Sequence, residues 1–211
     1  MELYCPQCSD FTSDSPRVYC CPSCGGPLAC AQEPASFPKE RLGLRPYTPW
    51  RYAEALPEWA GQLFLGEVIS PLVPFDVGGR SVLFKCDQAQ PTGSYKDRGA
   101  ELVSIEGPRP NATEALFAYI DQSDAVYASH LWNPLFIYGI QTLAFELVEQ
   151  LEWQAPDAVF CPVGAGSILL GLYEGFTRMH AVGATAYPDS LRYRPNASLP
   201  SIRLGSKVRT T

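Results

Sequence analysis

Residues 157–167 have the sequence Asp-Ala-Val-Phe-Cys-Pro-Val-Gly-Ala-Gly-Ser. The first half is apolar and rich in residues that favour strands, and the second half is a run of small residues. This pattern predicts a strand over 157–162 followed by a tight glycine turn. We expect a helix from Ser167 to about Val182. A strand, a glycine turn and a helix in this order are typical of an α/β fold.

A longer helix is predicted to begin at Asn133-Pro134, because asparagine is a good cap and proline suits the first helical position. Glu146, Glu149 and Glu152 are expected on the solvated side of this helix. Its apolar residues recur at intervals of three and four and so share one face; they are Phe136, Ile137, Ile140, Leu143, Ala144, Leu147 and Leu151.

Further elements complete an alternation of strands and helices. We expect strands over 81–86, 125–129 and 184–187, and a helix over 112–122 that Asn111 caps together with Glu114. This alternation predicts an α/β core with a mainly parallel sheet.

The composition of the chain argues against some classes of function. The chain has 211 residues, with 16 Lys and Arg against 22 Asp and Glu, for a net charge of −6. This balance argues against a nucleic-acid partner, which requires a basic surface. The longest apolar runs, such as residues 168–172, are far too short for a membrane span, and no signal segment opens the chain, so we expect a cytoplasmic protein with no membrane partner.

Six of the eight cysteines lie within the first 30 residues. Two copies of a Cys-Pro-x-Cys knuckle, Cys5 to Cys8 and Cys21 to Cys24, have the spacing of a structural zinc ribbon, in which four thiolates fill a tetrahedral shell. A disulfide framework and a vestigial site without metal are the alternatives. Cys20 and Cys30 are left over, and Cys20 could compete with Cys21 as a ligand. Cys86 and Cys161 are expected to be buried thiols.

We predict four regions along the chain: a zinc ribbon over 1–30, a proline-rich wrapping segment over 31–76, the α/β core over 77–189 and a basic tail over 190–211 that we expect to be disordered. Trp50, Tyr52 and Trp59 are expected to anchor the wrapping segment onto the core.

Two features could carry chemistry. The turn formed by Gly164, Ala165, Gly166 and Ser167 opens a helix and could cradle a phosphate, although such a turn can also be purely structural. Lys96 is one of only four lysines and follows a Pro-Thr-Gly-Ser turn, so it is a candidate for Schiff-base chemistry; from spacing alone, a solvated lysine paired with Asp97 or another acid is the simpler interpretation.

The eleven residues Gln90-Pro-Thr-Gly-Ser-Tyr-Lys-Asp-Arg-Gly-Ala100 resemble the Asn-Pro-Thr-Gly-Ser-Phe-Lys-Asp-Arg motif of the threonine synthases, which are fold type II pyridoxal-phosphate enzymes of the tryptophan synthase β-like family. The cysteine knuckles, the helix that begins at Asn133 and the glycine turn at 164–167 are similar to further stretches of that family, in the same order.

The resemblance implies a partial fold type II core in which Lys96 forms the Schiff base with pyridoxal phosphate and residues 164–167 hold its phosphate. It implies a lyase that acts on an amino acid of the O-phosphohomoserine type, replacing its γ-phosphate by water at Cβ. Asp97 and Arg98 are expected to stabilise the start of the lysine helix rather than to handle protons.

The sequence also departs from the family pattern. Gln90 replaces an asparagine, Ala165 and Ser167 stand where glycines are usual, and no Ser-Ser-Gly-Asn-Ala-Gly-like string occurs. We therefore expect a chain that is internally shortened and truncated at its C-terminus. Such a chain would need a homodimer partner or a second polypeptide to complete the fold. Otherwise it is an inactive relative that serves as a binding or scaffold protein, or a decayed fragment.

Overall fold

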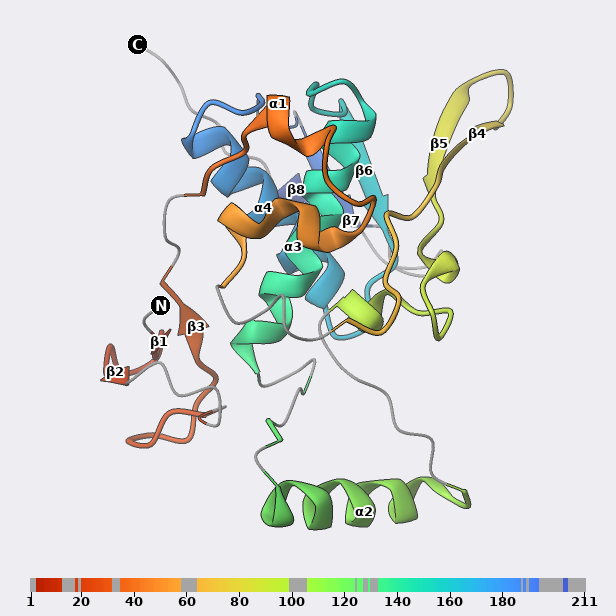
Figure 1. Ribbon diagram of the computed structural model, residues 1–211. Helices are drawn as coiled ribbons and strands as arrows, with labels where there is room; N and C mark the ends of the chain where they lie inside the picture. The colour runs from red at the N-terminus through yellow and green to blue at the C-terminus, as the bar shows by residue number, and fades with distance from the viewer. Residues whose placement is uncertain are drawn as a thin grey trace.

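The computed structural model describes residues 3–12, 18, 20–31, 35–57, 64–98, 106–123, 125–126, 129, 133–186, 188, 190–193 and 203–204. Figure 1 shows two helices, α3 and α4, packed together at the centre of the molecule. Three small sheets and a set of short helical turns surround them, and helix α2 lies apart from this body.

Helix α3 (Pro134–Gln150) begins where the sequence predicts. The Asn133 side chain accepts a hydrogen bond of 2.9 Å from the backbone N–H of Leu135, so one of the free amides of the first turn is satisfied. Helix α4 (Ser167–Ala181) is also confirmed.

The two central helices approach closely because α4 carries glycine at two positions one turn apart. A Cβ built on Gly171 would lie 2.5 Å from a side-chain carbon of Ile140, and one built on Gly175 would lie 2.7 Å from the Cβ of Ala144. Glycine therefore lets the backbone of α4 pack directly onto α3.

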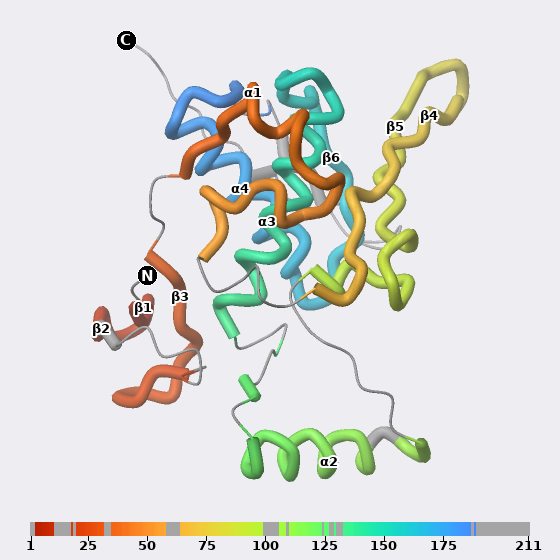
Figure 2. The backbone as a smooth tube through the Cα atoms, in the orientation of Figure 1, coloured from red at the N-terminus to blue at the C-terminus, as the bar shows by residue number. Residues whose placement is uncertain are grey.

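Residues 35–57 lie across this helix pair, as Figure 2 shows. They contain helix α1 (Lys39–Leu42) and the 3-10 helix η1 (Pro49–Ala55), so this segment is less extended than expected. Tyr52 is 1% exposed, and its ring packs edge-on against Phe145 of α3 at 5.5 Å, which confirms its predicted anchoring role. Trp59 lies outside the described residues.

The sheets differ from the expected single parallel sheet. Strand β6 (Ala158–Cys161) pairs parallel with β7 (Ser190–Tyr193), which pairs antiparallel with β8 (Arg203–Leu204). Strands β4 (Leu72–Asp76) and β5 (Ser81–Lys85) form a separate antiparallel hairpin. Within the described part of the chain β6–β7 is the one parallel pair, so a mainly parallel sheet is not confirmed.

Several predicted boundaries are wrong. Helix α2 (Arg109–Gln122) begins before Asn111, which is not its cap, because Pro110 falls within its first turn, where proline is well tolerated. The strand expected over 184–187 is absent at 184–186. Within the tail predicted to be disordered, residues 190–193 and 203–204 are in strands, and the rest of the tail lies outside the described residues. Residues 125, 126 and 129 are not in a strand, and the rest of that predicted strand lies outside the described residues, as does Tyr187.

The N-terminal module is a small antiparallel sheet of two-residue strands, β1 (Leu3–Tyr4), β2 (Phe11–Thr12) and β3 (Ala29–Cys30). Its buried side chains pack against Tyr138 and Leu135 at the start of α3. Among the described residues no helix is long and apolar enough to cross a membrane.

Candidate active site and metal centre

Lys96 lies in the 3-10 helix η4 (Tyr95–Arg98), directly after a tight turn. Gly93 adopts a positive φ of 75° in that turn and donates its N–H to the Gln90 carbonyl at 2.8 Å. The Asp97 carboxylate accepts from the N–H of Thr92 at 2.7 Å and from its hydroxyl at 2.5 Å. Asp97 therefore stabilises this turn, as expected, and Lys96 remains exposed.

The glycine turn leads from β6 into α4. Gly166 has a positive φ of 90°, a conformation that favours glycine, and a Cβ built on it or on Gly164 would meet no atom within 4 Å. The turn therefore opens onto free space. Gly164 and Ala165 are exposed, whereas Ser167, the first residue of α4, is 4% exposed. The first amides of any helix lack partners within it, so this helix start offers donors to an anion.

The fold brings the lysine turn and the glycine turn together. The hydroxyl of Tyr95 lies 3.0 Å from the hydroxyl of Ser167, although the two residues are 72 positions apart. The residue before Lys96 thus contacts the residue after Gly166. Gly99 and Ala100, the last residues of the lysine motif, lie outside the described residues.

A buried ionic cluster lies behind η4. The Arg98 guanidinium bonds both Glu146 and Asp87, and its Nη1 also donates to the Thr142 hydroxyl at 2.9 Å. The side chains of Arg98 and Glu146 are both fully buried. Burial alone would lower the pKa of Arg98. The carboxylates of Glu146 and Asp87 raise this pKa by more than burial lowers it, so the guanidinium keeps its charge.

Lys85 of β5 joins the same cluster. Its Nζ lies 2.7 Å from a Glu146 carboxylate oxygen and also donates to the Ser70 carbonyl and to the Gln150 side chain. Burial lowers the pKa of Lys85, against the opposing effect of Glu146. The cluster of Lys85, Asp87, Arg98 and Glu146 therefore holds two positive and two negative groups, and it ties η4 and β5 to α3.

This cluster corrects the prediction that the glutamates of α3 are solvated. Glu146 is fully buried, and Glu149 is half-buried and bonds Tyr52 and Arg51. Only Glu152 is exposed, beyond the end of the helix. Sequence reasoning missed Glu146, although it lies four residues after Thr142 and three after Leu143, which places it on the face that meets η4.

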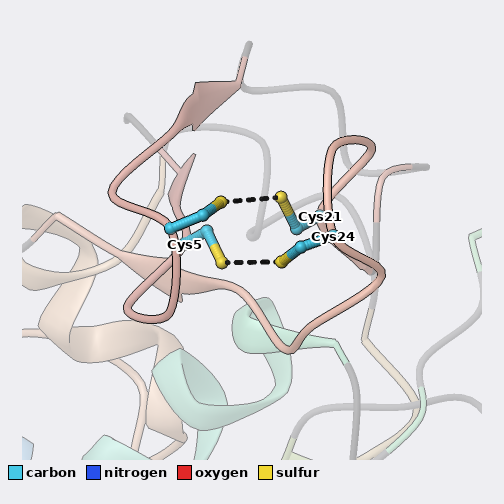
Figure 3. Close-up of side chains that lie close together, drawn as sticks. Cys5, Cys21 and Cys24 are labelled. Atoms are coloured by element: carbon cyan, nitrogen blue, oxygen red, sulfur yellow. Dashed lines mark hydrogen bonds between the residues drawn. The ribbon is translucent and has the colours of Figure 1, made fainter.

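The four knuckle cysteines converge in the N-terminal module (Figure 3). Cys5 lies 3.5 Å from Cys24, and Cys8 lies 3.6 Å from Cys21, measured between sulfurs. All four sulfurs lie within 4.8 Å of one another, so they could hold one metal ion. All eight cysteines are free thiols, which does not support the disulfide alternative.

The remaining cysteines are not part of this group. Cys20 pairs its backbone with Pro27, and Cys30 is buried in β3. Cys161 is buried, and Cys86 is half-buried.

The electrostatics of the four-cysteine group favour a cation. A hydrogen bond from the backbone N–H of Cys8 lowers the pKa of the Cys5 thiol to about 7. The backbone of Asp10 lowers the pKa of Cys8, but its contacts with Cys5 and Cys21 raise that pKa more, to about 12. Neighbouring thiolates repel, so four of them ionise together only around a positive charge.

Comparisons with known proteins show which sequences the chain is similar to. The sequence profile described as "Pyridoxal-phosphate dependent enzyme" matches residues 99–194. The threonine synthase of Methanosarcina acetivorans is 22% identical over 269 residues, and that of Methanocaldococcus jannaschii is 25% identical over 249 residues. These alignments cover 95% and 85% of this chain. A threonine synthase of a Bacillus species is 36% identical over 78 residues, which is 37% of this chain and 22% of the relative.

The chain is shorter than these relatives. It spans 66% and 61% of the lengths of the two archaeal threonine synthases. In the first alignment, 269 positions are matched by 95% of the 211 residues, or about 200, so several tens of positions within the matched stretch have no counterpart here. This bears out the expected internal shortening. The chain is therefore threonine synthase-like over most of its length and is shortened relative to these relatives, and residues 99–194 are similar to pyridoxal-phosphate dependent enzymes.

Proposed function

We propose that this chain binds pyridoxal phosphate between Lys96 and the glycine turn, and that it acts as a lyase on an amino acid of the O-phosphohomoserine type with release of phosphate. The observation that supports this most is the contact between Tyr95 and Ser167, because it joins the turn that carries the exposed Lys96 to the open start of α4.

The residues present fit this cofactor. Lys96 supplies a primary amine that no described side chain engages, and Gly164, Ala165, Gly166 and Ser167 supply a turn with room for a phosphate. The amides and the dipole at the start of α4 favour a dianion there. The cofactor would supply an electron sink for charge that develops on a bound amino acid.

A covalent labelling experiment tests the binding. The purified chain should develop an absorption band at about 410–420 nm when pyridoxal phosphate is added, because a lysine Schiff base forms. Reduction with borohydride followed by peptide mass spectrometry should locate the label on Lys96. Lys96→Ala should lose the band, whereas Lys39→Ala, a change of an exposed lysine in α1, should keep it. A label on Lys39 or Lys85 would contradict the assignment.

The alternative is an inactive relative that serves as a binding or scaffold protein. The internal shortening favours it, because a missing substrate clamp removes the positioning on which catalysis depends. Phosphate release from O-phosphohomoserine by the cofactor-loaded chain separates the two functions. Release supports the lyase, and a loaded chain that releases no phosphate supports the alternative.

We propose zinc as the ion at Cys5, Cys8, Cys21 and Cys24. Four thiolates at about 2.3 Å from a tetrahedral zinc lie about 3.8 Å apart, close to the Cys5–Cys24 and Cys8–Cys21 sulfur separations of 3.5 and 3.6 Å. Four protein ligands leave no open position, so the ion would be structural. Elemental analysis should find one zinc per chain, and Cys8→Ser should lose it while Cys86→Ser keeps it. A full metal content in Cys8→Ser would contradict this site.

We also propose that the chain acts as a homodimer or with a second polypeptide. The β4–β5 hairpin stands away from the body (Figure 1) and exposes Phe75 and Phe84, which are 55% and 49% accessible. Exposed apolar surface of this kind is costly in water. Sedimentation analysis should give twice the chain mass, or a monomer that a second chain converts to a complex.

A further inference from the structure

Tyr95 and Ser167 are the two residues that connect the halves of the proposed cofactor site. Their hydroxyls lie 3.0 Å apart, and either one can donate. Ser167 is 4% exposed and Tyr95 is half-buried, so water competes little for this bond.

The two halves of the site are otherwise held to α3 separately. Arg98 fixes η4 through Thr142 and Glu146, and Gly171 fixes α4 against Ile140. These contacts set the position of each half relative to α3. The bond between Tyr95 and Ser167 joins the halves directly, one residue from Lys96 and one residue from Gly166.

When an anion is bound at the start of α4, the chemistry of a serine hydroxyl determines which of the two hydroxyls donates the hydrogen bond. A hydroxyl has one hydrogen to donate and two lone pairs to accept. If Tyr95 donates to Ser167, the single Ser167 hydrogen stays free for an anion at the start of α4. If Ser167 donated to Tyr95 instead, its hydrogen would be used up.

We propose that Tyr95 is a positioning residue: it donates its hydroxyl to Ser167, fixes the spacing between Lys96 and the glycine turn, and leaves the Ser167 hydroxyl to donate to the cofactor phosphate. This inference rests on the proposed binding of pyridoxal phosphate. It assigns Tyr95 a role through Ser167 and not at the reacting atoms.

Binding titrations test the role, because pyridoxal lacks the phosphate that the bond is proposed to serve. Tyr95→Phe and Ser167→Ala should each weaken the binding of pyridoxal phosphate by about 2- to 10-fold, as expected for one hydrogen bond. The affinity for pyridoxal should change less than twofold. The double variant should bind no more weakly than the weaker single variant, because the two changes remove the same interaction. Tyr119→Phe, a change of an exposed tyrosine in α2, is the matched control and should bind like the unchanged chain.

The outcomes separate this inference from the proposed function. If the unchanged chain binds pyridoxal phosphate and Tyr95→Phe binds it equally well, the role of Tyr95 is refuted and the proposed function stands. Additive effects in the double variant, or an equal loss for pyridoxal, would also refute it. If the unchanged chain binds no pyridoxal phosphate, the proposed function fails and this role fails with it. Thermal melting of each variant without ligand checks that the chain is folded, so that a loss of binding is not a loss of structure.

Discussion

Replacing Glu146 by glutamine should be among the most destabilising single changes in this protein. Glu146 is fully buried and accepts hydrogen bonds from Arg98, from Lys85 at 2.7 Å and from the backbone N–H of Ser70 at 3.3 Å. Glutamine has nearly the same shape, so Glu146→Gln removes the charge and leaves the packing largely unchanged.

The cost follows from the charges in the cluster. Lys85 and Arg98 balance Asp87 and Glu146, so the variant leaves one uncompensated positive charge in the interior. Breaking a buried pair in this way costs about 3–5 kcal/mol. A domain has a stability of about 5–15 kcal/mol, so the variant should fold, with a small margin.

Urea unfolding at pH 7 measures this effect. With a slope of about 2 kcal/mol per molar urea, a loss of 4 kcal/mol moves the midpoint down by about 2 M. Thr142→Val, which removes one neutral partner of Arg98, should cost only about 1 kcal/mol. Glu152→Gln is the matched control, because Glu152 is exposed, and it should change the stability by less than about 0.5 kcal/mol. A loss below about 1 kcal/mol for Glu146→Gln would refute the buried-cluster argument.

Three further changes test other parts of the structure. Burial raises the pKa of Asp87, but the hydrogen bonds and positive charge of Arg98, together with Ser70 and Lys85, lower it more. The contribution of Asp87 to stability is therefore present above the unfolded value of about 3.9 and is lost as the pH falls through the lower folded value. Urea titrations between pH 6 and 2 should show this loss, and Asp87→Asn should reduce it. Burial raises the pKa of Tyr52, so the folded state keeps a proton that the unfolded chain loses near pH 10. The free energy of unfolding should therefore fall as the pH rises above 10, and Tyr52→Phe should remove this dependence on pH. Gly175→Ala places a methyl group 2.7 Å from the Cβ of Ala144 and should cost about 1–3 kcal/mol in thermal or urea unfolding, and a neutral result would show that α3 and α4 can separate.

Local signals predicted the central elements well. The cap at Asn133 and the strand–glycine–helix pattern around 158–167 depend on residues that are neighbours in the sequence, and the structure confirms them. The pairing of the strands depends on distant partners instead. No feature of the β5 sequence indicates that it pairs only with β4 in the described part of the chain, so the expected parallel sheet was not confirmed.

The buried cluster was missed for a similar reason. A glutamate in a helix that also has an apolar face is usually solvated, so the sequence predicts an exposed Glu146, and this prediction is wrong. Its partners, Arg98 and Lys85, are 48 and 61 positions away, so no local pattern reveals them. The motif predicts that Arg98 stabilises the start of the lysine helix, but no local pattern indicates that Arg98 does so from inside the core.

The buried cluster and Lys96 carry different information about function. Arg98 and Glu146 hold the fold together, so an inactive relative would need them as much as an enzyme would. Lys96 is exposed and no described side chain engages it, so Lys96→Ala should leave the unfolding free energy within about 0.5 kcal/mol of the unchanged chain. A residue that stability does not require can be changed without unfolding the chain, so its part in ligand binding can be tested separately. Intact stability in Lys96→Ala together with lost pyridoxal phosphate binding would therefore assign Lys96 to the ligand, whereas a destabilised variant would assign it to the fold.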